Sequence, residues 1–166
     1  MSTDAIVMLR DDHKQILRCF RDFEQAGDRA TKKKGDLVDR MIELLTVHTY
    51  IENEVMYPRV RELVPDLEDD VLESYEEHHV ADLLVVELAS MKPDNERFTA
   101  KTTVLIENVR HHIEEEEQEW FPQVREALGR KQLQQIGAEM AQARERAPRR
   151  PSQPSALKKT IDAVIS

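Results

Sequence analysis

One pattern of residues occurs twice in this chain of 166 residues. Residues 47–62 read VHTYIENEVMYPRVRE and residues 111–126 read HHIEEEEQEWFPQVRE, so a histidine, a glutamate and a proline recur at the same spacing. A histidine and a glutamate four residues apart lie one turn apart on the same face of a helix. Two further histidines, His13 and His78, are separated by almost the same interval as the two segments. The sequence therefore predicts one pair of helices that occurs twice.

Four long segments carry apolar residues at steps of three and four, the period of an amphipathic helix. They are residues 4–26, 36–57, 67–91 and 97–121, and Pro58 and Pro122 are expected to kink or restart the second and the fourth. Only 4 Gly and 7 Pro occur in the chain, which favours helices over strands and tight turns. We therefore predict an all-α, antiparallel up-down four-helix bundle with an additional C-terminal helical segment and tail.

The C-terminal part of the chain differs in composition from the rest. An amphipathic segment at 131–146 is expected to extend the bundle or to lie across one end of it. Residues 147–155, APRRPSQPS, are typical of an extended or disordered linker, and residues 156–166 are expected to form a short helix or a loosely docked tail. We predict one domain at 1–146, followed by a linker and tail at 147–166.

Charge and cysteine content exclude several classes of protein. The net charge of −9 argues against binding to nucleic acid or to an anionic membrane. The chain has no apolar run of about 18 residues and begins without a secretory leader pattern, so a cytoplasmic location is expected. Cys19 is the only cysteine, which excludes an internal disulfide and a cysteine-rich zinc site, and it is expected in the core. We expect a monomer or a weak dimer.

The two repeats supply six candidate metal ligands: His13, His48, Glu52, His78, His112 and Glu116. His13 and His48 fall on the apolar faces of their helices. Burying such groups without partners would cost on the order of a few kcal/mol each, which a marginally stable domain cannot absorb. A shared cation offsets this cost. Four histidines and two carboxylates exceed the needs of one tetrahedral zinc and suit two ions; zinc and manganese remain possible, and the ligand types favour iron.

These six residues resemble the hemerythrin-like family, also called the HHE cation-binding domain, whose pattern is H, H-x-x-x-E, H, H-x-x-x-E. The resemblance covers about residues 5–127 and includes the steps Tyr57-Pro58 and Phe121-Pro122. It implies a non-haem di-iron centre, oxo- or hydroxo-bridged, in which the four histidines are terminal ligands and the two glutamates bridge. It also implies oxygen binding, iron or oxygen sensing, or defence against peroxide or nitric oxide. The fifth histidine of the animal oxygen carriers has no obvious counterpart.

Three residues near the six are candidates for an extra ligand or for a donor hydrogen-bonded to a ligand: Tyr75, His79 and His111. Tyr75 lies one turn before His78 and is alternatively a plain buried tyrosine. His79 shares its helix face with Leu72, Tyr75, Leu83 and Val86, so it is an alternative to His78 as ligand, although the repeat and the family pattern favour His78. His79 and His111 are otherwise surface neighbours. Large residues around the repeats are expected to pack around the metal chamber: Phe20, Met56, Tyr57, Trp120 and Phe121.

The leading functional hypothesis is a di-iron site that reacts with hydrogen peroxide, oxygen or nitric oxide. Catalase-like peroxide disproportionation in oxidative stress defence is the favoured enzymatic outcome, because two ions can exchange two electrons without an organic cofactor. A second hypothesis is a non-enzymatic module that binds oxygen or nitric oxide, or senses iron or oxygen, with residues 147–166 as its output. A third is iron storage or a structural metal site.

Overall fold

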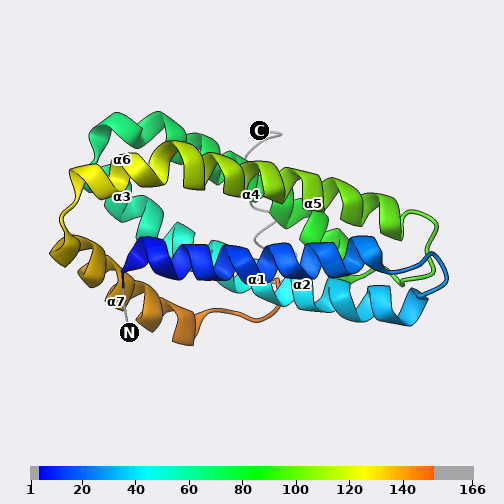
Figure 1. Ribbon diagram of the computed structural model, residues 1–166. Coiled ribbons are helices and arrows are strands. Elements are labelled where there is room, and N and C mark those ends of the chain that lie inside the picture. The colour runs from blue at the N-terminus through cyan, green and yellow to red at the C-terminus, as the bar shows by residue number, and fades with distance from the viewer. Residues whose placement is uncertain (1–3, 152–166) are drawn as a thin grey trace, which may run out of the picture.

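The computed structural model describes residues 4–151, and within this range the chain is helical and contains no β-strand (Figure 1). The long helices are α1 (Ala5–Gln25), α2 (Thr31–Ile51), α4 (Glu68–Ala89), α5 (Phe98–Glu115) and α7 (Arg130–Arg146). The short ones are α3 (Tyr57–Leu63), α6 (Phe121–Ala127) and the 3-10 turn η2 (Pro65–Leu67). Two π-helical turns, η1 (Glu52–Met56) and η3 (Glu116–Trp120), join α2 to α3 and α5 to α6.

Helices α1, α2, α4 and α5 form an antiparallel up-down bundle (Figure 1). Helix α1 packs against α2 and α5, and α4 packs against the same two helices, which closes the bundle. The predicted all-α bundle is therefore confirmed. None of the helices in residues 4–151 is both long and apolar enough to cross a membrane.

Helix α1 begins where the sequence predicts it. The side chain of Asp4 accepts hydrogen bonds from the backbone N–H groups of Ile6 and Val7, at 2.8 and 3.2 Å, and so caps the first turn. The apolar residues of the helix recur at steps of three and four, and Leu9, Ile16 and Phe20 are almost completely buried. This face fixes the direction in which α1 presents His13.

Helix α2 begins at Thr31, five residues before the predicted start at Asp36. Residues 31–35 read TKKKG and contain no apolar side chain, so the periodic pattern gave no indication of this first turn. The turn is held by other contacts. Lys34 is buried, with its Nζ 5.5 Å from the centre of the Phe23 ring and 4.0 Å from a carboxylate oxygen of Asp28.

Gly35 lies where α2 passes close to the turn between α4 and α5. A Cβ atom on Gly35 would stand 2.6 Å from Cγ of Pro93, too close for two carbon atoms in contact. The proline ring cannot rotate away as a flexible side chain could. The absence of a side chain at this position therefore lets the two segments approach each other.

We predict that Gly35→Ala destabilises the protein, although alanine in a helix interior normally gains about 1 kcal/mol over glycine. The clash with Pro93 should reverse that gain and leave a net loss of about 1–3 kcal/mol. Urea unfolding measures the change. Gly27→Ala is the matched control, since a Cβ there meets nothing within 4 Å. A more stable Gly35→Ala protein would contradict the close approach.

At each repeated proline the α-helix restarts after a π-helical turn, as expected: Pro58 is the second residue of α3, and Pro122 is the second residue of α6. Each is preceded by a π-helical turn, in which the N–H of Tyr57 bonds to the carbonyl of Glu52 and the N–H of Phe121 bonds to that of Glu116. Proline lacks an N–H, and this wider turn is one of the ways in which a helix accommodates an interrupted hydrogen-bond ladder. Pro58 then stands in the first turn of α3, and Pro122 in that of α6, where no N–H is needed.

The apolar core consists of two clusters with a polar layer between them. On α1, Leu9 belongs to one cluster and Ile16 to the other, with His13 between them. On α2, Leu45 and Ile51 flank the next histidine in the same way. The bundle therefore seals a single layer of polar side chains from both ends.

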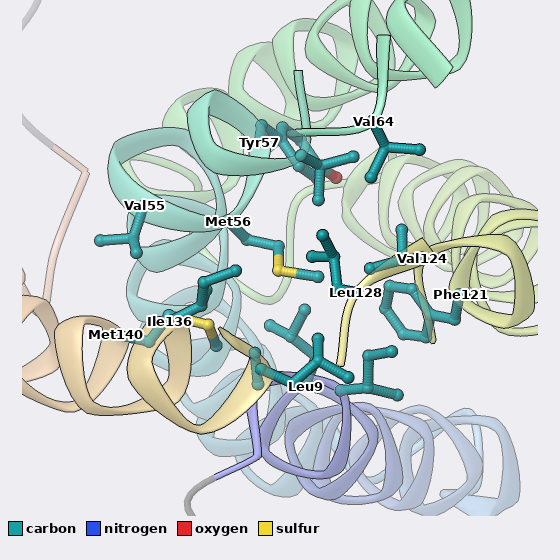
Figure 2. Close-up of a cluster of buried hydrophobic side chains, with 14 of the residues drawn as sticks. Leu9, Val55, Met56, Tyr57, Val64, Phe121, Val124, Leu128, Ile136 and Met140 are labelled. Atoms are coloured by element: carbon teal, nitrogen blue, oxygen red, sulfur yellow. The ribbon is translucent and has the colours of Figure 1, made fainter. Parts of the chain in front are cut away.

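Helix α7 packs against α1, α2 and η1 at one end of the bundle, as Figure 1 shows. Its residues Ile136 and Met140 join one apolar cluster with Leu9 and Met56 (Figure 2). The helical segment predicted at 131–146 thus extends the bundle. Residues 147–151 follow without helix, and Arg149 lies 3.6 Å from Glu43 of α2. The tail expected at 156–166, and the rest of the linker, lie outside the described residues.

Candidate metal centre

The polar layer brings together the six candidate ligands of the sequence analysis. They come from α1 (His13), α2 (His48), α4 (His78), α5 (His112) and the first residues of the two π-helical turns (Glu52 and Glu116). All six are buried, and the two glutamates have no exposed surface. Their ligand atoms form two groups, each within 4.8 Å: His13, His48 and Glu116, and Glu52, His78 and His112.

Each carboxylate faces one histidine of each group. Oε1 of Glu52 lies 2.8 Å from Nε2 of His48 and 3.3 Å from Nε2 of His78. Oε1 of Glu116 lies 3.3 Å from Nε2 of both His13 and His112. Each carboxylate therefore contacts both groups.

The two halves of the layer are nearly equivalent in geometry. The ring centres of His13 and His48 are 4.9 Å apart with an interplanar angle of 64°, and those of His78 and His112 are 4.8 Å apart at 65°. This likeness follows from the sequence repeat, because each half contributes its single histidine and its H-x-x-x-E turn at the same height in the bundle.

Several buried atoms of this layer lack a hydrogen bond. They are Nε2 of His48, both nitrogens of His13, both oxygens of Glu52 and Oε1 of Glu116. Unsatisfied buried polar atoms are rare in proteins, and each costs stability. Imidazole nitrogens and carboxylate oxygens that converge in this way suit divalent metal ions, which they bind as ligands. The residues present therefore fit a two-ion centre.

The outward nitrogen of each histidine has its own oxygen neighbour. Nδ1 of His48 lies 2.9 Å from Asp12, Nδ1 of His78 lies 2.8 Å from Asn53, Nδ1 of His112 lies 3.2 Å from Glu77, and Nδ1 of His13 lies 3.4 Å from Glu117. Such partners orient an imidazole and keep its Nε2 free to bind a metal. All four rings are therefore turned with Nε2 inward.

Asp12 extends this network to α7. Nη2 of Arg144 donates to both carboxylate oxygens of Asp12, at 3.0 and 2.9 Å, while Asp12 contacts His48. Burial would raise the pKa of Asp12, but the hydrogen bonds with His48 and Arg144 lower it. The carboxylate therefore stays charged, and α7 is connected to the layer through one ion pair.

Tyr57 is the residue that the sequence analysis placed only in the wall of the chamber. Its hydroxyl donates to Oε2 of Glu116 at 2.9 Å and lies 3.1 Å from Nε2 of both His78 and His112. In an α-helix a residue five positions after Glu52 would point about 140° away from it. In a π-helical turn the two residues are bonded and lie one above the other. The repeated Tyr-Pro and Phe-Pro steps were the only indication of this in the sequence.

The three additional candidates lie outside the layer. Tyr75 is partly buried, and its hydroxyl donates to the backbone carbonyl of Asn53 at 3.5 Å. His79 is only partly buried, and Leu72, which shares its face, is 41% exposed. The structure thus turns His78, rather than His79, toward the centre of the bundle.

His111 is exposed and forms a separate surface group with Glu77 and Glu115. Its Nε2 lies 3.0 Å from Glu115. The other residues expected around the chamber are buried, and the ring of Phe121 is parallel to that of His13 with the centres 5.9 Å apart.

The charges in the layer set its protonation in the absence of metal. Burial alone would lower the pKa of His48, but the charge of Glu52 and the hydrogen bond with Asp12 raise it to about 10. Burial would also lower the pKa of His112, but the charge of Glu116 raises it well above its usual value. Burial would raise the pKa of Glu52, but the charge of His48 holds it well below the usual range. Without metal, His48 and His112 therefore hold a second proton at neutral pH, and Glu52 stays ionised.

We predict that the metal-free protein is most stable between about pH 4.5 and about pH 6.5, the ordinary pKa values of a glutamate and a histidine, because Glu52 and Asp12 lose their stabilising contribution as pH falls below this range. A raised histidine pKa stabilises fully below the unfolded value of about 6.5, and this contribution is lost as pH rises through the folded value. For His48, this contribution to stability is lost between about pH 6.5 and about pH 10. Urea unfolding between about pH 7 and pH 9.5 should show a loss on the order of one to a few kcal/mol.

His48→Gln should flatten this pH dependence, whereas His111→Gln, on the exposed surface, should leave it unchanged. A free energy of unfolding that increases with pH across the window would contradict the protonation described above.

We predict that Arg144→Met lowers the free energy of unfolding by about 2 kcal/mol, because Asp12 keeps a buried charge and loses its hydrogen bonds with the guanidinium. Arg125→Met is the matched control. Arg125 contacts Asp4 at 3.1 and 3.3 Å, so it also binds an aspartate of the N-terminal region, but Asp4 caps α1, whereas Asp12 contacts His48 of the layer. Urea unfolding measures both. If Arg144→Met lowers the free energy of unfolding by no more than Arg125→Met does, a special role for the contact between Arg144 and Asp12 is contradicted.

Comparison with known proteins gives three findings. A family model described as the hemerythrin HHE cation-binding domain matches residues 4–124. A curated relative, a DNA nickase of Nostoc sp. (strain PCC 7120), is 27% identical over 143 residues, which are 86% of this chain and 40% of the relative. The chain thus spans less than half the length of that relative.

The third finding concerns the fold. The crystal structure of a hemerythrin HHE cation-binding domain-containing protein from Mycobacterium kansasii matches with a TM-score of 0.72 at 19% identity, over 86% of each chain. The family match covers most of the chain and includes all six residues of the buried layer. The resemblance found in the sequence is confirmed: the chain belongs to the hemerythrin HHE cation-binding domain family.

Proposed function

We propose that the buried layer holds two iron ions and that this pair reacts with hydrogen peroxide, oxygen or nitric oxide, with peroxide consumption as the leading reaction. The terminal ligands are His13, His48, His78 and His112, and the bridging ligands are Glu52 and Glu116. One observation carries the proposal: each carboxylate faces one histidine of each group. A single ion would leave half of these contacts unused.

The donor set supports iron over softer or harder metals. It combines imidazole nitrogen with carboxylate oxygen, and Tyr57 adds a phenol oxygen beside it. No thiolate takes part, because Cys19 lies in an apolar cluster, where burial raises the pKa of its thiol to about 11. The set is also too rich in nitrogen for magnesium or calcium.

The chemistry that a di-iron pair supplies is two-electron exchange with a small oxidant, without an organic cofactor. The chain contributes the surroundings. Burial and the charges of Glu116 and Glu52 raise the pKa of Tyr57 well above 10, so its hydroxyl keeps its proton and donates a hydrogen bond within the layer. Trp120 and Phe121, both buried, keep bulk water away from this side.

A non-enzymatic sensor of oxygen, nitric oxide or iron is the second candidate. It is favoured by the contact of Arg144 with Asp12, because this ion pair connects the layer to a helix from which the C-terminal tail continues. We do not extend the nickase activity of the Nostoc relative to this chain, since the net charge of −9 opposes binding to a phosphate backbone.

The test is metal analysis of protein purified without added metal, together with its visible spectrum and oxygen release after addition of hydrogen peroxide. We expect about two irons per chain, because the six ligands suit two ions. If peroxide consumption is the reaction, oxygen evolution is rapid. Glu116→Gln should lose at least about half of the iron. Glu115→Gln, the neighbouring residue that points away from the layer, should keep it.

Two irons that bind nitric oxide or oxygen without turnover would support the sensor. One zinc per chain, or no metal in the wild-type protein, would contradict the di-iron proposal, both as a peroxide-consuming enzyme and as a sensor.

A further inference from the structure

A hollow of about 130 Å³ lies where α1, α2, α7 and the segment after α7 meet. Its lining is mainly polar and includes three arginines and two carboxylates: Asp12 from α1, Arg40 and Glu43 from α2, Arg144 from α7, and Arg149 from the segment that follows. None of the six candidate metal ligands lines it. The hollow is therefore separate from the polar layer, although Asp12 borders both.

Two of the arginines are incompletely paired. Arg40 and Arg149 both face one carboxylate, that of Glu43, with nitrogen to oxygen distances of 3.8 and 3.6 Å. These distances exceed those of a hydrogen bond, so two guanidinium groups share one negative charge and these contacts leave their N–H donors unused. Both arginines are exposed, so a molecule in solvent has access to the hollow.

Arg144 is the least exposed of the three arginines. It uses a single nitrogen, Nη2, for both hydrogen bonds with Asp12, and a guanidinium group has five N–H donors. Both oxygens of Asp12 have partners, because one of them also contacts His48. Three arginines and two carboxylates leave one positive charge in excess, within a chain of net charge −9. Such a local excess attracts an anion whatever the net charge of the chain.

We propose that this hollow binds an oxyanion of the size of phosphate, held by Arg40, Arg144 and Arg149. A cavity of roughly 150 Å³ holds one benzene molecule, so the volume here suits a group of about five heavy atoms. Planar guanidinium groups donate paired hydrogen bonds to phosphate and carboxylate oxygens. Three arginines from separate segments offer more donors than the two oxygens of a carboxylate accept, which favours a phosphoryl group. The group belongs to free phosphate or to a phosphate ester.

The test is titration of inorganic phosphate into the full-length protein at constant ionic strength, followed by calorimetry. We expect about one phosphate per chain, with a dissociation constant of about 1 mM or lower. Arg149→Gln should raise this constant at least about tenfold, the effect of losing one hydrogen bond between charged groups. Arg149 is exposed and lies outside the helices, so the substitution leaves the fold intact.

Arg150→Gln is the matched control, because it removes the same charge one residue further along the chain. Arg150 lies 3.7 Å from Asp39 and does not line the hollow. Its substitution should leave the dissociation constant within about twofold of the wild-type value, as for other surface changes outside a site.

Methyl phosphate in the same titration distinguishes the two sources of the ligand. Binding as tight as that of inorganic phosphate, or tighter, assigns the hollow to the phosphoryl group of an ester, and weaker binding assigns it to the free ion. The inference is overturned if neither compound shows saturable binding, or if Arg149→Gln binds phosphate as tightly as Arg150→Gln does. Phosphate that bound at the metal centre instead would give this last result, since Arg149 does not reach the layer.

Discussion

The burial of two carboxylates, Glu52 and Glu116, is the constraint on which the rest of this structure depends. Neither has any exposed surface, and a buried charge is tolerated only where opposite charges or metal ions compensate it. Four helices must therefore bring one histidine each to the same height, and apolar clusters must close the layer above and below. The outward oxygen partners of the histidines complete the arrangement, because an imidazole that rotated would leave a carboxylate alone.

Much of this could be predicted from the sequence. The repeat, the helical periodicity and the H-x-x-x-E spacing predict the bundle and the set of residues in the layer, since side chains four apart share a helix face. Spacing could not predict Tyr57, because its direction depends on a π-helical turn that breaks the α-helical period. The start of α2 was missed for a related reason: its first turn is held by a buried lysine and a close glycine rather than by an apolar face.

Contacts between distant segments could not be predicted from the sequence either. Nothing in the spacing of Asp12 and Arg144 indicates that they meet, because they are separated by most of the chain and belong to helices of which only one lies in the repeat. Periodicity describes each helix by itself, and these features arise where helices touch.

The π-helical turns make the two halves of the bundle alike in backbone, yet the residue that each turn presents differs by one oxygen atom. The first presents Tyr57, whose hydroxyl reaches into the layer, and the second presents Phe121, whose ring is parallel to His13. Ions held in this layer would therefore have unequal surroundings, one beside a hydroxyl group and the other beside a hydrocarbon face. A duplicated architecture thus yields two positions that are not interchangeable, and the difference between them is encoded at a single side chain.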